Sequence, residues 1–412
     1  MRPEQAGFRL GVNYWPATSA MAWLADDDPA GTRADFRRIV SAGFDTARVF
    51  VRWEDVQPTA RHIDAGVLRR VVDAADAAHD VGLALIVTLF TGHMSGANWI
   101  PPWALGGSGG DERFRVVSGG RVLPPRTAIR NWYSDPDVGA AQERLAAAVA
   151  GALSGHPAVW AWDLGNENSN CTVPPDTSSA ESWLERITGV IRRRDPGRLI
   201  TIGIHMEDLE EDRVIGPAEA AAHCDFVSMH GYPIYAAWSA GPVDVRVVPF
   251  LEAVTRWLAG GVPVFFEEFG LPTIPAAGIE SPMAVDESRT ADYIGSVLDG
   301  LWANGAIGAA VWCFSDYAAS LFGSAPFDRS VHERSFGLWR ADGSAKPAVA
   351  AVRARSGRQR QPSSGLEWID IGPGEFAMGR RAQLARLYAR YCDHVGDRLS
   401  ADAAARRGTD AE

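Results

Sequence analysis

Eight short apolar segments alternate with longer segments of helical period along most of this chain. We expect the apolar segments to be strands, at residues 8–14, 44–51, 83–90, 158–165, 198–204, 225–230, 263–268 and 308–314. Between them, Ala- and Arg-rich segments bounded by Gly or Pro predict helices, most clearly at 65–80, 138–153, 180–194, 245–259 and 287–304. A strand and a helix alternating eight times predict a (β/α)8 TIM barrel.

The 412 residues are enough for one such barrel and a short extension. We expect a catalytic barrel at 1–355, a polar linker at 356–365, and a C-terminal helical tail at 366–412. The tail should be packed on the barrel or partly disordered, with an amphipathic helix at 382–395. The connection at 91–135, after the third strand, is too long for an ordinary loop and predicts a wall of a substrate cleft.

Charge and composition exclude several classes of function. The net charge of −11 argues against a nucleic-acid partner, which would need clustered Lys and Arg. The sequence begins without a charged-then-apolar leader and has no long uncharged apolar stretch, so we expect no membrane span and a cytoplasmic protein, or a secreted one if a leader has been trimmed. The four cysteines are scattered, and no metal-binding motif is present, so we expect no metal and no cofactor.

Two of the predicted strands end abruptly in carboxylates. One ends at Asn166-Glu167 and the other at Glu267-Glu268. A glutamate at the end of a buried strand loses hydration unless a partner or a reaction employs it. The carboxyl ends of barrel strands share one face, so two such strands predict a pair of facing carboxyl groups, and that pair is typical of glycoside hydrolysis.

Other predicted strands end in polar residues at the same face, which is more than a core would explain. These residues are Asn13, Arg48, His93, His205 and His230. The runner-up architecture, an open doubly wound sheet, lacks its glycine fingerprint, because the first strand is followed by Asn13-Tyr14-Trp15-Pro16.

Together these motifs resemble the clan of retaining (β/α)8 glycosidases, and most closely glycoside hydrolase family 5 with its mannanase-like and cellulase-like members. The resemblance covers roughly residues 8–355 and rests on Asn166-Glu167, on Glu268-Phe269-Gly270, and on counterparts of other expected family residues, namely Arg48, His93, His230, Tyr232 and Trp312. It implies a glycosidase with Glu268 as the nucleophile and Glu167 as the acid/base. Two departures are Asn168, where a proline commonly follows the Asn-Glu pair, and Glu267, a second carboxylate beside Glu268.

The resemblance also implies supporting roles. Arg48 should hold the pKa of Glu268 down, and Tyr232 should contact the nucleophile. Asn166 should bind the sugar 2-hydroxyl, and the neighbours of Glu167 should raise its pKa. The remaining candidates for sugar contact are His93, His205, His230 and Trp312, with Trp15, Trp99 and Trp103 as possible subsite aromatics.

The residues and the resemblance together predict a retaining β-glycoside hydrolase with a carbohydrate substrate. The mannanase-like resemblance implies β-mannosidic bonds as the first choice, with β-glucosidic or β-galactosidic bonds next. A transglycosidase would use the same carboxylate pair. A barrel that binds glycans without turnover is the alternative from another class, although a pure binder has no need of a buried nucleophile.

Overall fold

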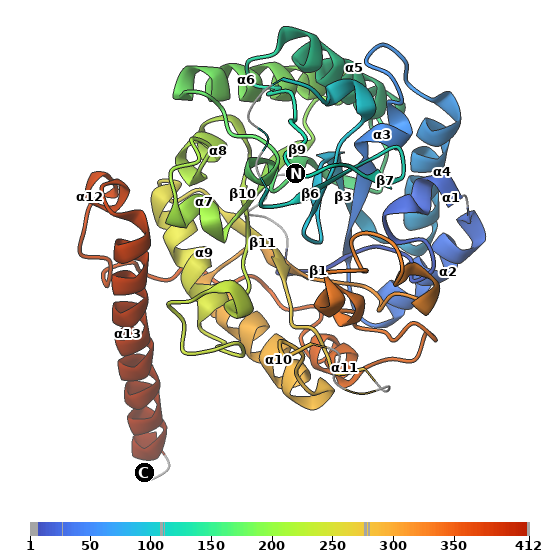
Figure 1. Ribbon diagram of the computed structural model, residues 1–412. Coiled ribbons are helices and arrows are strands. Elements are labelled where there is room, and N and C mark those ends of the chain that lie inside the picture. The colour runs from blue at the N-terminus through green and yellow to red at the C-terminus, as the bar shows by residue number, and fades with distance from the viewer. Residues whose placement is uncertain are drawn as a thin grey trace.

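The computed structural model describes residues 7–26, 28–107, 110, 112–275, 278 and 281–409, with side chains described as far as residue 396. Within these residues, eight parallel strands close into a barrel, and helices cover its outside (Figure 1). Going round the barrel, the order is β1, β12, β11, β10, β9, β8, β3 and β2. The barrel strands are β1 (Arg9–Asn13), β2 (Thr46–Arg52), β3 (Ala84–Thr91), β8 (Val159–Asn166), β9 (Leu199–His205), β10 (Val227–His230), β11 (Val264–Phe269) and β12 (Gly308–Val311).

A helix follows each barrel strand before the next one begins. The main helices are α2 (Pro29–Ser41), α4 (Ala65–Val81), α5 (Pro136–Ala152), α6 (Thr177–Arg194), α8 (Pro217–His223), α9 (Val247–Leu258), α10 (Glu287–Asn304) and α11 (Pro347–Arg353). Shorter helices at the strand ends and loops are α1 (Trp23–Asp26), α3 (Trp53–Val56), α7 (Met206–Glu210), η2 (Ala20–Ala22), η3 (Pro102–Ala104), η4 (Asn168–Asn170), η5 (Pro233–Tyr235), η6 (Ala319–Leu321) and η7 (Val331–Ser335). The predicted TIM barrel is therefore confirmed, and each predicted strand ends within three residues of the observed one.

Aspartates begin five of the main helices. The side chains of Asp28, Asp64, Asp135, Asp176 and Asp286 accept hydrogen bonds from backbone N–H groups in the first turns of α2, α4, α5, α6 and α10. These N–H groups have no partner within the helix, so a short acidic side chain at the cap stabilises the helix start. The sequence thereby fixes where each helix turns back along the outside of the barrel.

The long connection between β3 and α5 forms a small sheet beside the barrel mouth. Its strands are β4 (His93–Met94), β5 (Ala97–Trp99), β6 (Arg115–Ser118) and β7 (Arg121–Val122), paired in that order. This insertion is tied to the loop after β12, since the guanidinium of Arg115 donates two hydrogen bonds of 2.8 Å to the carboxylate of Asp328. Two loops far apart in sequence thus meet over the same part of the mouth.

The C-terminal tail packs on the outside of the barrel and then extends beyond it (Figure 1). It contains α12 (Pro373–Ala377) and α13 (Arg380–Thr409), which is longer than the helix expected at 382–395. The rings of Trp368, Tyr388 and Tyr391 all contact Phe250 of α9. Among the described helices, none is both long and apolar enough to cross a bilayer.

Candidate active site

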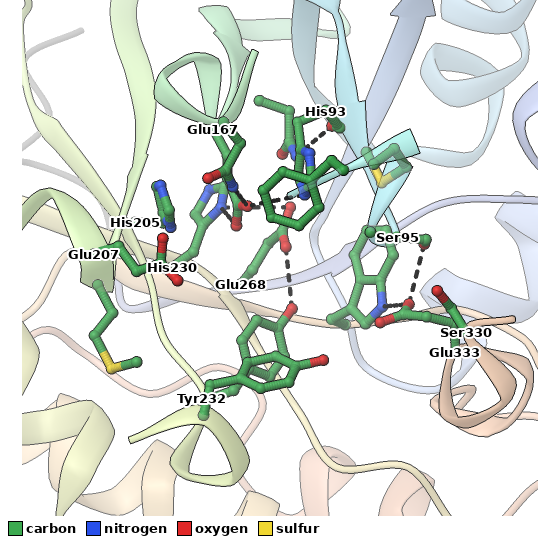
Figure 2. Close-up of a pocket in the computed structure, with 18 of the residues that line it drawn as sticks. His93, Ser95, Glu167, His205, Glu207, His230, Tyr232, Glu268, Ser330 and Glu333 are labelled. Atoms are coloured by element: carbon green, nitrogen blue, oxygen red, sulfur yellow. Dashed lines mark hydrogen bonds and ion pairs between the residues drawn. The ribbon is translucent and has the colours of Figure 1, made fainter. Parts of the chain in front are cut away.

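A cavity of about 580 Å³ opens at the carboxyl ends of the barrel strands (Figure 2). Most of the residues predicted from strand ends line it, and Arg48 lies fully buried beneath it, in contact with Glu268. The predicted residues that line the cavity are His93, Asn166, Glu167, His205, His230, Tyr232, Glu268 and Trp312.

Glu268 and Glu267 are both buried at the end of β11, but only Glu268 lines the cavity. The pairing register of β11 shifts between Phe266 and Phe269, which re-aims the side chains at this end of the strand. Glu268 accepts hydrogen bonds from Arg48 Nη1 at 2.5 Å and from Tyr232 Oη at 3.0 Å. Glu267 instead lies behind, 3.4 Å from Arg48 Nε and 3.4 Å from His230 Nε2.

Arg48 is the positive centre of a buried cluster of carboxylates. Its guanidinium contacts Asp163 at 2.7 Å, Glu268 at 2.5 Å and Glu267 at 3.4 Å. An isolated buried charge has a large desolvation free energy. The attraction between the buried arginine and the carboxylates hydrogen-bonded to it offsets that free energy. Burial and the nearby charge of Glu267 still raise the pKa of Asp163 to about 6, against the opposing effect of Arg48. Through its hydrogen bond with Arg48, the cluster therefore holds the carboxylate of Glu268 in position beneath the cavity.

Glu167 follows β8 in a left-handed backbone conformation, with φ of 49°. Such a conformation is unfavourable for a side chain larger than glycine, and strain of this kind gathers at functional sites. The carboxylate accepts a hydrogen bond from Asn170 Nδ2 at 3.0 Å and lies 3.0 Å from His230 Nδ1. One oxygen of Glu167 and one of Glu268 lie within 4.8 Å of each other.

The proton affinities of the two carboxyl groups differ from the sequence expectation. Burial raises the pKa of Glu167, but the positive charges that His205, His230 and His93 can carry lower it by more, so the net shift is downward. Burial raises the pKa of Glu268, and the charges of His230 and Arg48 only partly oppose it. The expected rise in the pKa of Glu167 and fall in the pKa of Glu268 are thus both reversed, because three imidazoles surround Glu167 and burial dominates at Glu268.

The three histidines differ in their partners. His93 Nδ1 is 2.7 Å from Asn98 Oδ1, and burial lowers the pKa of His93. His205 Nε2 lies 3.0 Å from Ser169 Oγ. His230 is buried, which lowers its pKa, but contacts with Glu268, Glu167 and Glu267 outweigh burial and raise it to about 10. Its Nδ1 lies 3.0 Å from Glu167 and 3.7 Å from Glu268.

Asn166 presents an unused hydrogen-bonding atom at the cavity. Its Nδ2 donates to His93 O at 2.9 Å, while its buried Oδ1 has no hydrogen-bond partner among the residues that the structure describes. An unsatisfied buried oxygen carries a free-energy penalty of about 1 to 3 kcal/mol, so a ligand hydroxyl at this position would remove that penalty.

The three tryptophans predicted as possible subsite aromatics do not line the cavity. Trp15 is fully buried and stacks on Phe50, with ring centroids 4.6 Å apart. Trp99 is also buried, and Trp103 packs edge-on against Trp53 at 5.2 Å. These rings hold the loops on the barrel, and this part of the prediction is corrected. The rings that do line the cavity include Phe114, Tyr232, Tyr235, Trp312 and Phe336.

Sequence reasoning missed a further carboxyl group in the cavity, Glu333. Glu333, in the loop after β12, is 8% exposed and lines the cavity with Ser95, from the loop after β3. Neither residue ends a predicted strand, so no periodic pattern pointed to them. Their presence in long, irregular connections is the one signal that could have drawn attention to them.

Comparison with known proteins agrees with this geometry. The family model described as "Cellulase (glycosyl hydrolase family 5)" matches residues 5–318. Among solved structures, a family 5 protein from Streptomyces cattleya in complex with Manβ1-4GlcNAc is 25% identical, covers 93% of this chain and 92% of its own, and has a TM-score of 0.77. An exo-β-1,4-mannosidase from Opitutaceae bacterium strain TAV5 is 26% identical, covering 85% of this chain and 59% of its own at a TM-score of 0.69.

A curated relative is more distant. A putative mannan endo-1,4-β-mannosidase from Oryza sativa subsp. japonica is 22% identical across 73% of this chain and 64% of its own length, so the chain spans less than two thirds of that relative. The family match, in contrast, extends over most of the barrel and includes both strand-end glutamates. The chain is therefore a glycoside hydrolase and belongs to glycosyl hydrolase family 5.

Proposed function

We propose that this protein is a retaining β-mannosidase that cleaves β-mannosidic bonds by double displacement. The observation that carries the proposal is the facing pair of Glu167 and Glu268, with one oxygen of each within 4.8 Å. Retaining glycosidases hold their two carboxyl groups about 5 to 5.5 Å apart, while inverting enzymes need roughly 6.5 to 9.5 Å to admit a water molecule. The short distance favours retention.

In the first step, a carboxylate oxygen of Glu268 attacks the anomeric carbon while Glu167 donates its proton to the departing glycosidic oxygen. In the second step, Glu167 removes a proton from water, which attacks the same carbon and releases Glu268. The reaction starts from the form in which Glu167 is protonated and Glu268 is ionised. Arg48 and Tyr232, both hydrogen-bonded to Glu268, stabilise its ionised carboxylate in that form.

Other residues bind the sugar. The unpaired Asn166 Oδ1 would accept a hydrogen bond from the 2-hydroxyl, an interaction that strengthens in the transition state. The choice of mannose is supported by the relatives, since one structure holds Manβ1-4GlcNAc and another is an exo-β-1,4-mannosidase.

The test is hydrolysis of a panel of aryl β-mannoside, β-glucoside and β-galactoside, with proton NMR of the first sugar released. We expect the mannoside to have the highest kcat/KM and the product to appear first as the β-anomer. An α-anomer as the first product would contradict double displacement, and preference for another sugar would contradict mannoside specificity. Added sugar acceptors would divert the glycosyl group to new glycosides if the enzyme is a transglycosidase.

A further inference from the structure

The cavity has a second polar centre, separate from the carboxylate pair. It consists of Glu333 and Ser330 from the loop after β12 and Ser95 from the loop after β3. Figure 2 shows these three residues on one side of Glu268, while His205 and Glu207 lie on the other side. The cavity therefore has two distinct ends with the nucleophile between them.

Loops from three strands close the Glu333 end. Ser95 Oγ donates to Glu333 Oε2 at 3.0 Å, which joins the β3 loop to the β12 loop. The paired hydrogen bonds from Arg115 to Asp328 join the same two loops again. The hydroxyl of Tyr235, after β10, lies 2.8 Å from His332 Nε2. Ser95, Tyr235, His332 and Glu333 all line the cavity, so these joined loops form its wall at this end.

The hydrogen-bond donors that hold Glu333, among the described residues, are neutral groups. Its Oε2 accepts from Ser95 Oγ and, at 3.3 Å, from Trp312 Nε1. Among the described residues, no arginine or lysine pairs with it, and burial lowers the pKa of the adjacent His332. Burial raises the pKa of Glu333 to about 7, although the hydrogen bonds from Ser95 and Trp312 act the other way. A buried carboxyl group at a cavity wall, without a positive charge to offset its loss of hydration, is characteristic of a binding site.

The second carboxyl oxygen of Glu333 is available to a ligand. Among the residues that the structure describes, the nitrogen that pairs with Oε1 is His332 Nε2 at 3.5 Å, and that nitrogen already lies 2.8 Å from Tyr235 Oη. The donor in Trp312 connects this carboxyl to the cavity floor, because Trp312 also lines the cavity. A sugar hydroxyl inside the cavity and next to Oε1 would complete the hydrogen bonding of the Glu333 carboxyl group.

The acid/base fixes which end receives which part of the substrate. Glu167 protonates the departing oxygen, so the leaving group lies toward Glu167 and its neighbours His205 and Glu207. The sugar that reacts at Glu268 then extends toward Glu333. In a pyranose ring, C4 is opposite the anomeric carbon, so its hydroxyl and those next to it point to the closed end.

We propose that Glu333 binds the hydroxyl groups of the non-reducing terminal sugar at C4 and its neighbours, and that the wall behind it limits this side of the cleaved bond to one sugar. The inference rests on the proposed glycosidase function and deepens it: the enzyme removes single sugars from chain ends. Ser95 and Trp312 are positioning residues, since they orient the carboxyl group of Glu333.

The test compares the full-length enzyme with Glu333→Leu on aryl β-mannosides that carry or lack the hydroxyl at C3, C4 or C6. We expect the wild type to lose about 3- to 10-fold in kcat/KM with at least one deoxy substrate, as when one hydrogen bond between neutral groups is removed. Glu333→Leu should lose a similar factor with the parent substrate but no further factor with that deoxy substrate. The proposal would be overturned if removing each hydroxyl from the substrate reduced kcat/KM by the same factor in the wild type and in Glu333→Leu; we call this factor the deoxy penalty.

Two controls separate this result from misfolding and from failure of the proposed function. Glu252→Gln changes another buried glutamate, which is paired with Arg256 one turn further along α9 and lies outside the cavity, and it should leave every deoxy penalty unchanged. Calorimetric titration of β-1,4-mannobiose and its deoxy forms into Glu268→Gln, with and without Glu333→Leu, measures binding without turnover. Binding that depends on Glu333 without any hydrolysis by the wild type would refute the function and keep this site. Release of mannobiose from the non-reducing end of mannotetraose would overturn the one-sugar limit.

Discussion

Glu268 and Glu333 are buried carboxyl groups in the same cavity, but the protein holds them in opposite ways. Glu268 ends a barrel strand and contacts Arg48, whose guanidinium also contacts Asp163 and Glu267. Glu333 is in a loop and accepts hydrogen bonds from the neutral groups of Ser95 and Trp312. A reacting carboxylate needs a nearby cation to stay ionised, whereas a group that binds hydroxyls needs position and a free oxygen.

The largest expected effect is at the nucleophile. Glu268→Gly should reduce kcat on an aryl β-mannoside by on the order of 10⁴-fold or more, because the covalent step is lost. Azide should restore part of the activity by occupying the empty position, and the product should be the α-configured glycosyl azide. Glu333→Gly should gain nothing from azide. Azide rescue of a Glu267 variant and not of Glu268→Gly would mean that the wrong carboxylate of β11 has been assigned.

The next effect tests the cation. Arg48→Met leaves three buried carboxyl groups without their shared partner, so the pKa of Glu268 should rise further and the acidic limb of the kcat/KM profile should move to higher pH. The plateau should fall, and the free energy of unfolding should drop by about 3 to 5 kcal/mol. Arg48→Lys, which keeps the charge, is the control. A lower plateau with an unmoved acidic limb would show that Arg48 acts through positioning or folding alone.

The third prediction concerns the carboxyl group held by neutral donors. The folded-state pKa of Glu333 is about 7, above the ordinary value of 4.5, so the folded protein binds more protons than the unfolded chain between these values. Its contribution to stability is therefore fully present below about pH 4.5 and is lost as the pH rises through about 7. The side chain of Glu333→Gln does not titrate. Between pH 4.5 and pH 8, the free energy of unfolding of the wild type should therefore fall by about 1 to 3 kcal/mol more than that of Glu333→Gln.

Urea unfolding of both proteins at the two pH values measures this difference. Glu112→Gln, at an exposed glutamate of the β3 insertion, should leave the wild-type pH dependence unchanged. If Glu333→Gln and the wild type lose stability in parallel as the pH rises, the carboxyl group is not held in its neutral form, and the contrast with Glu268 disappears.

The same contrast explains how far the sequence could predict the site. Glu167, Glu268 and His230 occur at or near the ends of apolar strands, and barrel geometry brings such ends to one face. Arg48 lies inside β2, where a charged residue within an apolar strand is itself a signal. Glu333 is held by hydrogen bonds between loops that no local pattern encodes.

The tryptophans show the converse limit of prediction from sequence: they were expected at the cavity, but the structure places them elsewhere. Trp15, Trp99 and Trp103 are aromatic residues near the barrel mouth, so the sequence allowed them as sugar platforms. The structure instead buries Trp15 and Trp99 and packs the partly buried Trp103 against Trp53, away from the cavity. A ring that seals a loop and a ring that faces a ligand have the same identity in a sequence. Burial decides between the two roles, and burial depends on the path of the whole loop.

The smallest effect is expected at Glu267, which belongs to the Arg48 cluster but does not reach the cavity. Glu267→Gln removes one negative charge beside Arg48 and His230 while keeping the side-chain shape, so Arg48 remains paired with Asp163 and Glu268. We expect kcat/KM to fall by about 10-fold, as for one weakened hydrogen bond to a charged group, with no rescue by azide. The loss of that charge should also lower the pKa of His230, because Glu267 helps to raise it. NMR titration of the His230 ring measures this shift, and an unchanged His230 would show that Glu267 shapes the site through Arg48 alone.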